Sequence, residues 1–186
     1  MSTFVESRLE FVFDENWQVE RWDEQPAYRS TGGFASVPGT SACDFLGRHA
    51  AAPAVYLIEV KNFTEYHHAN RDKPTSAAWA ETLAAKVRDT LAGALWTRGR
   101  SFDEPPIRAL VDDTFAALLR DKPALRVVFW VEDRPPLDPA VASALEMAIR
   151  RHLVRWFRIG NVRVTSRSRF DPAWVPGLTV RPAGGS

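Results

Sequence analysis

Hydrophobic and polar positions change period along this chain, and the change predicts which segments are strands and which are helices. Short apolar runs rich in β-branched and aromatic residues predict strands at 41–46, 55–63, 125–131 and 161–165. A further strand is predicted inside 17–23. Apolar residues at spacings of three and four predict helices over 77–97, 106–120 and 138–157. The chain therefore combines both kinds of element.

The two ends of the chain carry weaker local signals. Thr3 followed three residues later by Glu6 fits a helix N-cap, which predicts a short helix to about Phe13. The Pro- and Gly-rich segment 170–186 is typical of a loosely attached tail. The resulting order α-β-β-β-α-α-β-α-β favours an α/β fold, a mixed sheet with helices on both faces. We expect one domain over 1–169.

Composition indicates a soluble globular protein. The length of 186 residues suits one domain with a sizeable core, and 45% hydrophobic and 25% charged residues are typical of such domains. No apolar run reaches the length of a membrane span, and the N-terminus lacks the pattern of a signal peptide. Cys43 is the only cysteine, so no internal disulfide can form. We expect a cytoplasmic protein without a membrane partner.

Basic side chains are concentrated near the C-terminus, although the net charge is only +1. Residues 146–186 hold eight arginines against two acids. Arg151, Arg155 and Arg158 follow at helical spacings of four and three, so they are expected to share one face. Arginine favours bidentate phosphate contacts, which predicts a nucleic-acid-binding face. A merely solvated helix face explains the same pattern equally well.

Charged residues inside two apolar strands form the main candidate site. Side chains alternate along a strand, so Glu59 and Lys61 share one face of the 55–63 strand. In an antiparallel hairpin whose turn is centred between Ala51 and Ala52, Asp44 lies opposite Glu59. Buried charges are costly unless they are paired or bind a metal. Two carboxylates beside a lysine suit a Mg²⁺ ion and a water that attacks a phosphate; the alternative is a cross-strand ion pair neutralised by Lys61.

At this point the sequence resembles the PD-(D/E)XK nuclease superfamily. The resemblance rests on Cys43-Asp44-Phe45-Leu46 and on Leu57-Ile58-Glu59-Val60-Lys61-Asn62-Phe63. A group of bacterial proteins in that superfamily is also similar through residues 13–23 and through Tyr28-Arg29. The likeness covers about residues 4–63, and Cys43 stands where the superfamily name has proline.

The resemblance implies a fold and a set of roles. The fold would be restriction-endonuclease-like, with an αβββαβ core, the 106–120 helix as an addition, and a C-terminal helix and strand. Asp44, Glu59 and the Val60 carbonyl would bind Mg²⁺ or Mn²⁺, and Lys61 would orient the attacking water. The substrate would be nucleic acid, DNA ahead of RNA.

Further site residues follow from the same resemblance. An acid on the first helix often joins the metal site in this superfamily, and we take Glu10, on the helix expected up to about Phe13, as that residue. Glu6, one helical turn away, also fits as a capping residue, and Glu20 and Asp23 are weaker alternatives. Arg29 and Lys73 are candidates for phosphate contacts, although solvated loop residues would look the same.

Two classes of function remain open after this reading. The first is a metal-dependent nuclease, and the second is a catalytically silent binding or protein-interaction module on the same fold. A homodimer or a protein partner is compatible with either class. The chain has no Gly-rich phosphate loop followed by Lys and Ser or Thr, which excludes an ATPase of that type.

Overall fold

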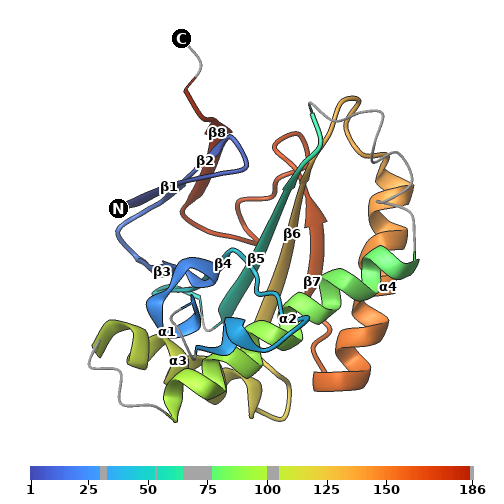
Figure 1. The fold of residues 1–186 in the computed structure, drawn as a ribbon. Coiled ribbons are helices and arrows are strands. Elements are labelled where there is room, and N and C mark those ends of the chain that lie inside the picture. Colours follow the sequence, from blue (N-terminus) through green and yellow to red (C-terminus); the bar gives the residue numbers. More distant parts are fainter. Residues whose placement is uncertain (30–32, 53, 65–76, 100–104, 185–186) are drawn as a thin grey trace.

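A five-stranded mixed sheet forms the centre of the protein (Figure 1). The computed structural model describes residues 1–29, 33–52, 54–64, 77–99 and 105–184. The strands follow the order β3-β4-β5-β6-β7, with bounds β3 Trp17–Arg21, β4 Phe45–His49, β5 Val55–Asn62, β6 Leu125–Glu132 and β7 Val162–Thr165. β3, β4 and β5 pair antiparallel, whereas β5, β6 and β7 are parallel. The predicted strands at 17–23, 55–63, 125–131 and 161–165 are therefore confirmed. The strand predicted over 41–46 instead begins at Phe45 and runs to His49.

Three long helices cover one face of this sheet. They are α2 Ala77–Arg98, α3 Pro105–Leu118 and α4 Pro139–Phe157, and all three positions match the predicted helices. Short turns of helix precede β4: η1 Trp22–Glu24, α1 Pro26–Arg29 and η2 Phe34–Ser36. The helices bury their apolar stripes against alternate residues of the sheet, such as Leu57, Val127 and Val164, and this forms the larger hydrophobic core.

A second sheet covers the other face. It has the order β1-β2-β8, with β1 Ser2–Glu6, β2 Leu9–Phe13 and β8 Leu178–Pro182. Leu9, Phe11 and Phe13 pack onto Ile58 and Trp130 of the large sheet in a separate core. Figure 1 shows this sheet away from α2, α3 and α4. The α/β class is confirmed, whereas the expectation of helices on both faces is wrong.

The predicted N-terminal helix is also wrong. Residues 2–13 form the β1–β2 hairpin, in which Ser7 and Arg8 have positive φ angles of 50° and 61°. A two-residue turn of this kind matches the twist of a hairpin. The alternation of Leu9, Phe11 and Phe13 buries one face of β2, and this burial outweighs the local capping pattern at Thr3.

The C-terminal segment is part of the folded structure rather than a loose tail. β8 pairs antiparallel with β2 over five residues, and Val175 and Leu178 are buried. Gly177 has a φ of +68°, and a Cβ there would lie 2.3 Å from a carboxylate oxygen of Asp14. The positive φ and the nearby Asp14 side chain both favour glycine at this turn into β8. Gly177, one of the glycines that suggested a loose tail, instead allows the chain to pass close to Asp14.

Candidate metal centre

The hairpin of β4 and β5 brings the two predicted carboxylates together. Phe45 pairs with Ile58, which is the predicted register; continued by one residue, it sets Asp44, just before β4, opposite Glu59. Asp44 is 6% exposed, and its Oδ2 accepts a hydrogen bond of 2.6 Å from the Val60 amide. The backbone of β5 therefore fixes the orientation of the Asp44 carboxylate.

Glu59 is the most deeply buried acid of the site, with 1% of its surface exposed. Its Oε1 lies 2.6 Å from Lys61 Nζ and 2.8 Å from Lys86 Nζ. These are ion-pair distances without the angular geometry of a hydrogen bond. Glu59 Oε2 accepts no hydrogen bond from any residue that the structure describes. A buried carboxylate oxygen without a hydrogen-bond partner is costly unless a nearby cation offsets its charge.

Lys86 was not among the residues predicted from the sequence. It projects from α2 toward the sheet, and Nζ donates a hydrogen bond of 3.1 Å to the Ala42 carbonyl. Its side chain is 16% exposed, against 35% for Lys61. The available signal was a lysine within the inward stripe of α2, between Leu83 and Thr90, both of which are buried. A charge at such a position needs a buried partner.

Electrostatics link the acids closely. Burial, together with the charge of Glu59, raises the pKa of Asp44 to about 8. Burial lowers the pKa of Lys86, but the attraction of the Glu59 carboxylate for the ammonium has the larger effect, so the pKa of Lys86 is raised overall. A bound divalent cation would favour the ionised form of Asp44 and reverse the first shift. Protonation of Asp44 and binding of a divalent cation would therefore oppose each other.

Glu10 does not join this site, which corrects the prediction for that residue. It lies on the outer face of β2 and pairs with Arg181 of β8, with 2.6 Å between Nη2 and Oε1. The inward face of β2 carries Leu9 and Phe11 instead. The prediction failed because residues 9–13 form a strand, in which Glu10 points away from the large sheet.

Two of the weaker alternatives lie nearer to the site. The charge of Glu6 contributes to the raised pKa of Asp44, and Glu6 forms an ion pair with Arg21. Asp23 of η1 is partly buried, and burial with the charge of Glu6 raises its pKa. Glu20 accepts a hydrogen bond of 2.7 Å from Gln25. The end of β1 therefore supplies the nearby acid that was expected from a helix.

The predicted phosphate-binding residues are spread over the molecule. Arg29 is exposed at the end of α1, and Lys73 lies outside the described residues. Arg151 and Arg155 are exposed on α4, whereas Arg158 ends the helix in a left-handed conformation.

The arginines of α4 lie apart from the carboxylates. α4 leads from the end of β6 to the start of β7, and these strands are parallel to β5. Its C-terminal end therefore lies at the edge where the parallel strands begin, whereas Glu59 and Lys61 lie in the second half of β5 (Figure 1). The structure does not bring the arginine face and the metal centre together.

The available ligands suit a site of few protein groups. Among the described residues, no cluster of three or more His, Cys, Asp or Glu side chains occurs. Asp44 and Glu59 supply two carboxylates, and the Val60 carbonyl is the third oxygen that the sequence resemblance implies. Mg²⁺ is commonly held by one or two carboxylates, with water and phosphate oxygens in its other positions. The donor set therefore fits Mg²⁺ or Mn²⁺.

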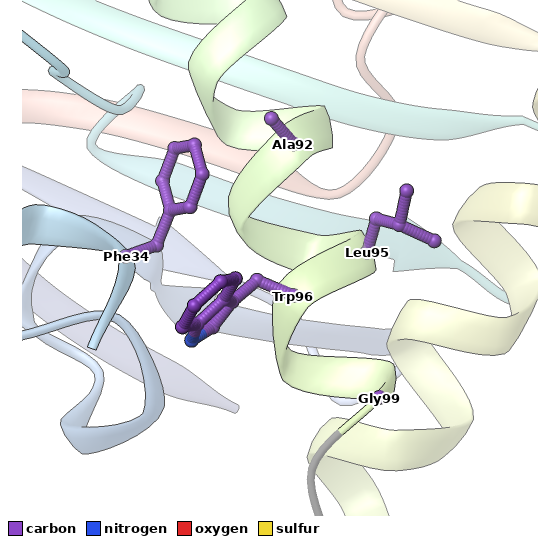
Figure 2. A pocket seen from close by; sticks show the side chains of 5 residues that line it. All are labelled: Phe34, Ala92, Leu95, Trp96 and Gly99. Carbon is purple, nitrogen blue, oxygen red and sulfur yellow. The ribbon is translucent and has the colours of Figure 1, made fainter. Parts of the chain in front are cut away.

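An apolar pocket of about 550 Å³ lies farther along α2 (Figure 2). Its lining comes from η2 and from the last turns of α2; the residues are Phe34, Ala92, Leu95, Trp96 and Gly99. None of these side chains can serve as an acid, a base or a metal ligand. The pocket is therefore not a second candidate for the chemistry.

No family model, curated protein or solved structure matches this chain. In the described part of the chain, no helix is both long and apolar enough to cross a membrane. The resemblance drawn from Asp44, Glu59 and Lys61 stays a prediction. The geometry of the site is therefore what bears on function.

Proposed function

We propose that this protein is a metal-dependent phosphodiesterase that cleaves nucleic acid, DNA ahead of RNA, and that its fold is restriction-endonuclease-like. One observation carries the proposal: Asp44 and Glu59 are both buried and meet on adjacent strands, and Glu59 Oε2 has no hydrogen-bond partner among the described residues. Lys61 lies beside them at the more exposed side of the cluster. Buried carboxylates of this kind are costly unless they bind a cation.

Asp44, Glu59 and the Val60 carbonyl would hold Mg²⁺ or Mn²⁺. The ion would lower the pKa of a bound water and neutralise charge on the phosphate. Asp44 is held for ligation by the Val60 amide, which leaves Oδ1 without a hydrogen bond from the described residues. Lys61 is able to turn from Glu59 toward substrate because its side chain is the more exposed of the two lysines.

The proposed reaction is the hydrolysis of a phosphodiester bond. Water attacks phosphorus in line with the leaving oxygen and loses a proton to solvent. The bond from phosphorus to the 3′ oxygen breaks, and this oxygen takes up a proton, so that a 3′-hydroxyl and a 5′-phosphate result. Lys61 would orient the water and stabilise the charge that grows on the phosphate oxygens.

A binding module without catalysis is the second candidate. It is favoured by the ion pairs of the cluster, because Lys61 and Lys86 already offset the charge of Glu59. In that case the four residues are a structural ion cluster, and the site needs no metal. The net charge of +1 is equally compatible with a partner other than nucleic acid.

Calorimetry with Mn²⁺ separates the two candidates. We expect wild type to bind the ion and Asp44→Asn to lose that binding, since the variant removes a ligand charge while keeping the side-chain shape. Asp112→Asn is the matched control, because Asp112 is an exposed acid on α3 that pairs with Arg98 of α2. Equal Mn²⁺ affinity in all three proteins would contradict the proposed metal centre.

A further inference from the structure

Two ammonium groups converge on one carboxylate oxygen in the interior of this protein. Lys61 and Lys86 both contact Glu59 Oε1, at 2.6 Å and 2.8 Å. They come from different elements, Lys61 from β5 and Lys86 from α2. If only one lysine is needed to act on substrate, the second requires its own explanation.

The surroundings of the two lysines differ. Lys86 Nζ is held by two groups, because besides its ion pair with Glu59 it donates a hydrogen bond of 3.1 Å to the Ala42 carbonyl. Its side chain is less than half as exposed as that of Lys61, at 16% against 35%. An ammonium that is mostly buried and held by an ion pair and a hydrogen bond loses more on leaving than a half-exposed one does. Lys86 is therefore the fixed cation of the cluster.

We infer that Lys86 is a built-in counter-cation that competes with a divalent metal ion for Glu59 and keeps the metal affinity of this site low. The inference rests on the proposed metal centre. Lys86 occupies one side of the Glu59 carboxylate in the metal-free protein and offsets its charge. An ion that binds Glu59 and Asp44 meets the positive charge of Lys86 at short range, and like charges in a partly buried site repel strongly.

The same arrangement stabilises the protein before the ion arrives. If both the metal ion and the Lys86 charge were absent, the buried Glu59 carboxylate would have only the half-exposed Lys61 to offset it. Lys86 supplies the second positive charge permanently. Lys86 is thus a positioning residue that acts through Glu59, and its predicted effect is on metal affinity and metal-free stability rather than on the chemical step.

Neutral substitutions at position 86 test this inference. Lys86→Gln removes the charge and keeps a donor for the Ala42 carbonyl, and Lys86→Met removes both. In Mn²⁺ calorimetry we expect both variants to bind at least about tenfold more tightly than wild type, because a nearby like charge is gone. Lys86→Arg keeps the charge and should bind as weakly as wild type. Lys122→Met, at an exposed position, is the matched control and should change nothing.

A second readout does not depend on cleavage. In EDTA, Lys86→Gln should melt at a lower temperature than wild type, and Mn²⁺ should raise its melting temperature by more than it raises that of wild type. Should Lys86→Met fail to fold, Lys86→Gln decides the question. Unchanged or weaker Mn²⁺ binding in Lys86→Gln overturns the inference, and so does an absence of Mn²⁺ binding in every variant.

The outcomes also separate this inference from the proposed function. Tighter Mn²⁺ binding in the neutral variants supports the role of Lys86 even if wild type cleaves no nucleic acid. Conversely, cleavage by wild type with unchanged metal affinity in Lys86→Gln retains the phosphodiesterase and rejects the competing counter-cation.

Discussion

Glu59→Gln should destabilise the metal-free protein, although it removes one of two neighbouring acids. The substitution keeps the size of the side chain and deletes its charge. It leaves Lys86 as a buried ammonium whose one remaining acceptor among the described residues is the Ala42 carbonyl. The effect depends on which is larger, the lost attraction to two lysines or the relieved repulsion with Asp44.

The magnitudes favour destabilisation. Breaking a buried ion pair by removing one partner costs about 3–5 kcal/mol. The contact with Lys61, whose side chain is 35% exposed, adds about 0–1 kcal/mol. The repulsion that is relieved is small at pH 7, because the pKa of Asp44 is raised to about 8 and this carboxyl is mostly protonated. We therefore expect Glu59→Gln to lower the free energy of unfolding by about 3 kcal/mol, the lower end of the buried-pair range.

Urea unfolding in EDTA at pH 7, followed by tryptophan fluorescence, measures this change. Lys61→Met is the matched comparison and should cost about 1 kcal/mol or less, as expected for a half-exposed pair. The double variant Glu59→Leu with Lys86→Met should recover most of the loss, since no buried charge is left unpaired. If Glu59→Gln is as stable as wild type, or if Lys61→Met costs as much, the described ion pairs do not govern stability and the reasoning fails.

Four further outcomes follow from the same structure. Lys61→Ala should keep Mn²⁺ and nucleic-acid binding but slow single-turnover cleavage by about 10²–10³; a lower melting temperature with unchanged cleavage would favour a structural role. The raised pKa of Asp44 means that the folded state holds a proton that the unfolded state has lost, so the metal-free protein should lose up to about 1.4 kcal/mol of stability per pH unit between roughly pH 4 and pH 8; Asp44→Asn should flatten that slope in urea titrations. The triple variant Arg151→Gln, Arg155→Gln and Arg158→Gln should bind nucleic acid more weakly and with a smaller dependence on salt concentration, whereas an unchanged salt dependence would indicate a solvated face. Deleting residues 170–186 should cost at least roughly 3–6 kcal/mol through Val175 and Leu178 alone, and a truncated protein with wild-type stability would contradict the role of β8.

The β4–β5 hairpin could be predicted from the sequence because its information is local. Alternation fixes which residues of β5 share a face, and the length of the connection fixes the register. Both conclusions are confirmed, since Phe45 pairs with Ile58, and Tyr56 packs in the core opposite to that of Leu57. The expectation that Glu59 and Lys61 lie together holds for the same reason.

The N-terminal segment could not be predicted in the same way because its partner is distant in sequence. β2 is held between β1 and β8, and β8 lies near the other end of the chain. A local reading favours the capping pattern of Thr3 and Glu6, whereas pairing with β8 and burial of Phe11 decide the structure. The prediction that Glu10 joins the metal site was wrong for the same reason. As part of a strand, Glu10 lies on the outer face of the small sheet, and Glu6 lies nearer to Asp44.

Lys86 shows a different limit of sequence reading. Its contact with Glu59 depends on how α2 crosses the sheet, and no spacing within α2 encodes that crossing. The sequence contains only the indirect sign of a lysine in an inward stripe, beside Val87 and Thr90. Charged residues on the buried face of a helix are therefore worth including among candidate site residues before the fold is known.

Cleavage of a mixed panel of single- and double-stranded DNA and RNA decides whether this protein is a metal-dependent nuclease. Wild type and Asp44→Asn would be incubated with Mn²⁺ and with EDTA, and the ends of the products would be determined. We expect wild type to cleave with Mn²⁺ but not with EDTA and to leave a 5′-phosphate and a 3′-hydroxyl, and we expect no cleavage by Asp44→Asn. Equal cleavage by both proteins, or none by wild type on any substrate of the panel, would contradict the proposed function.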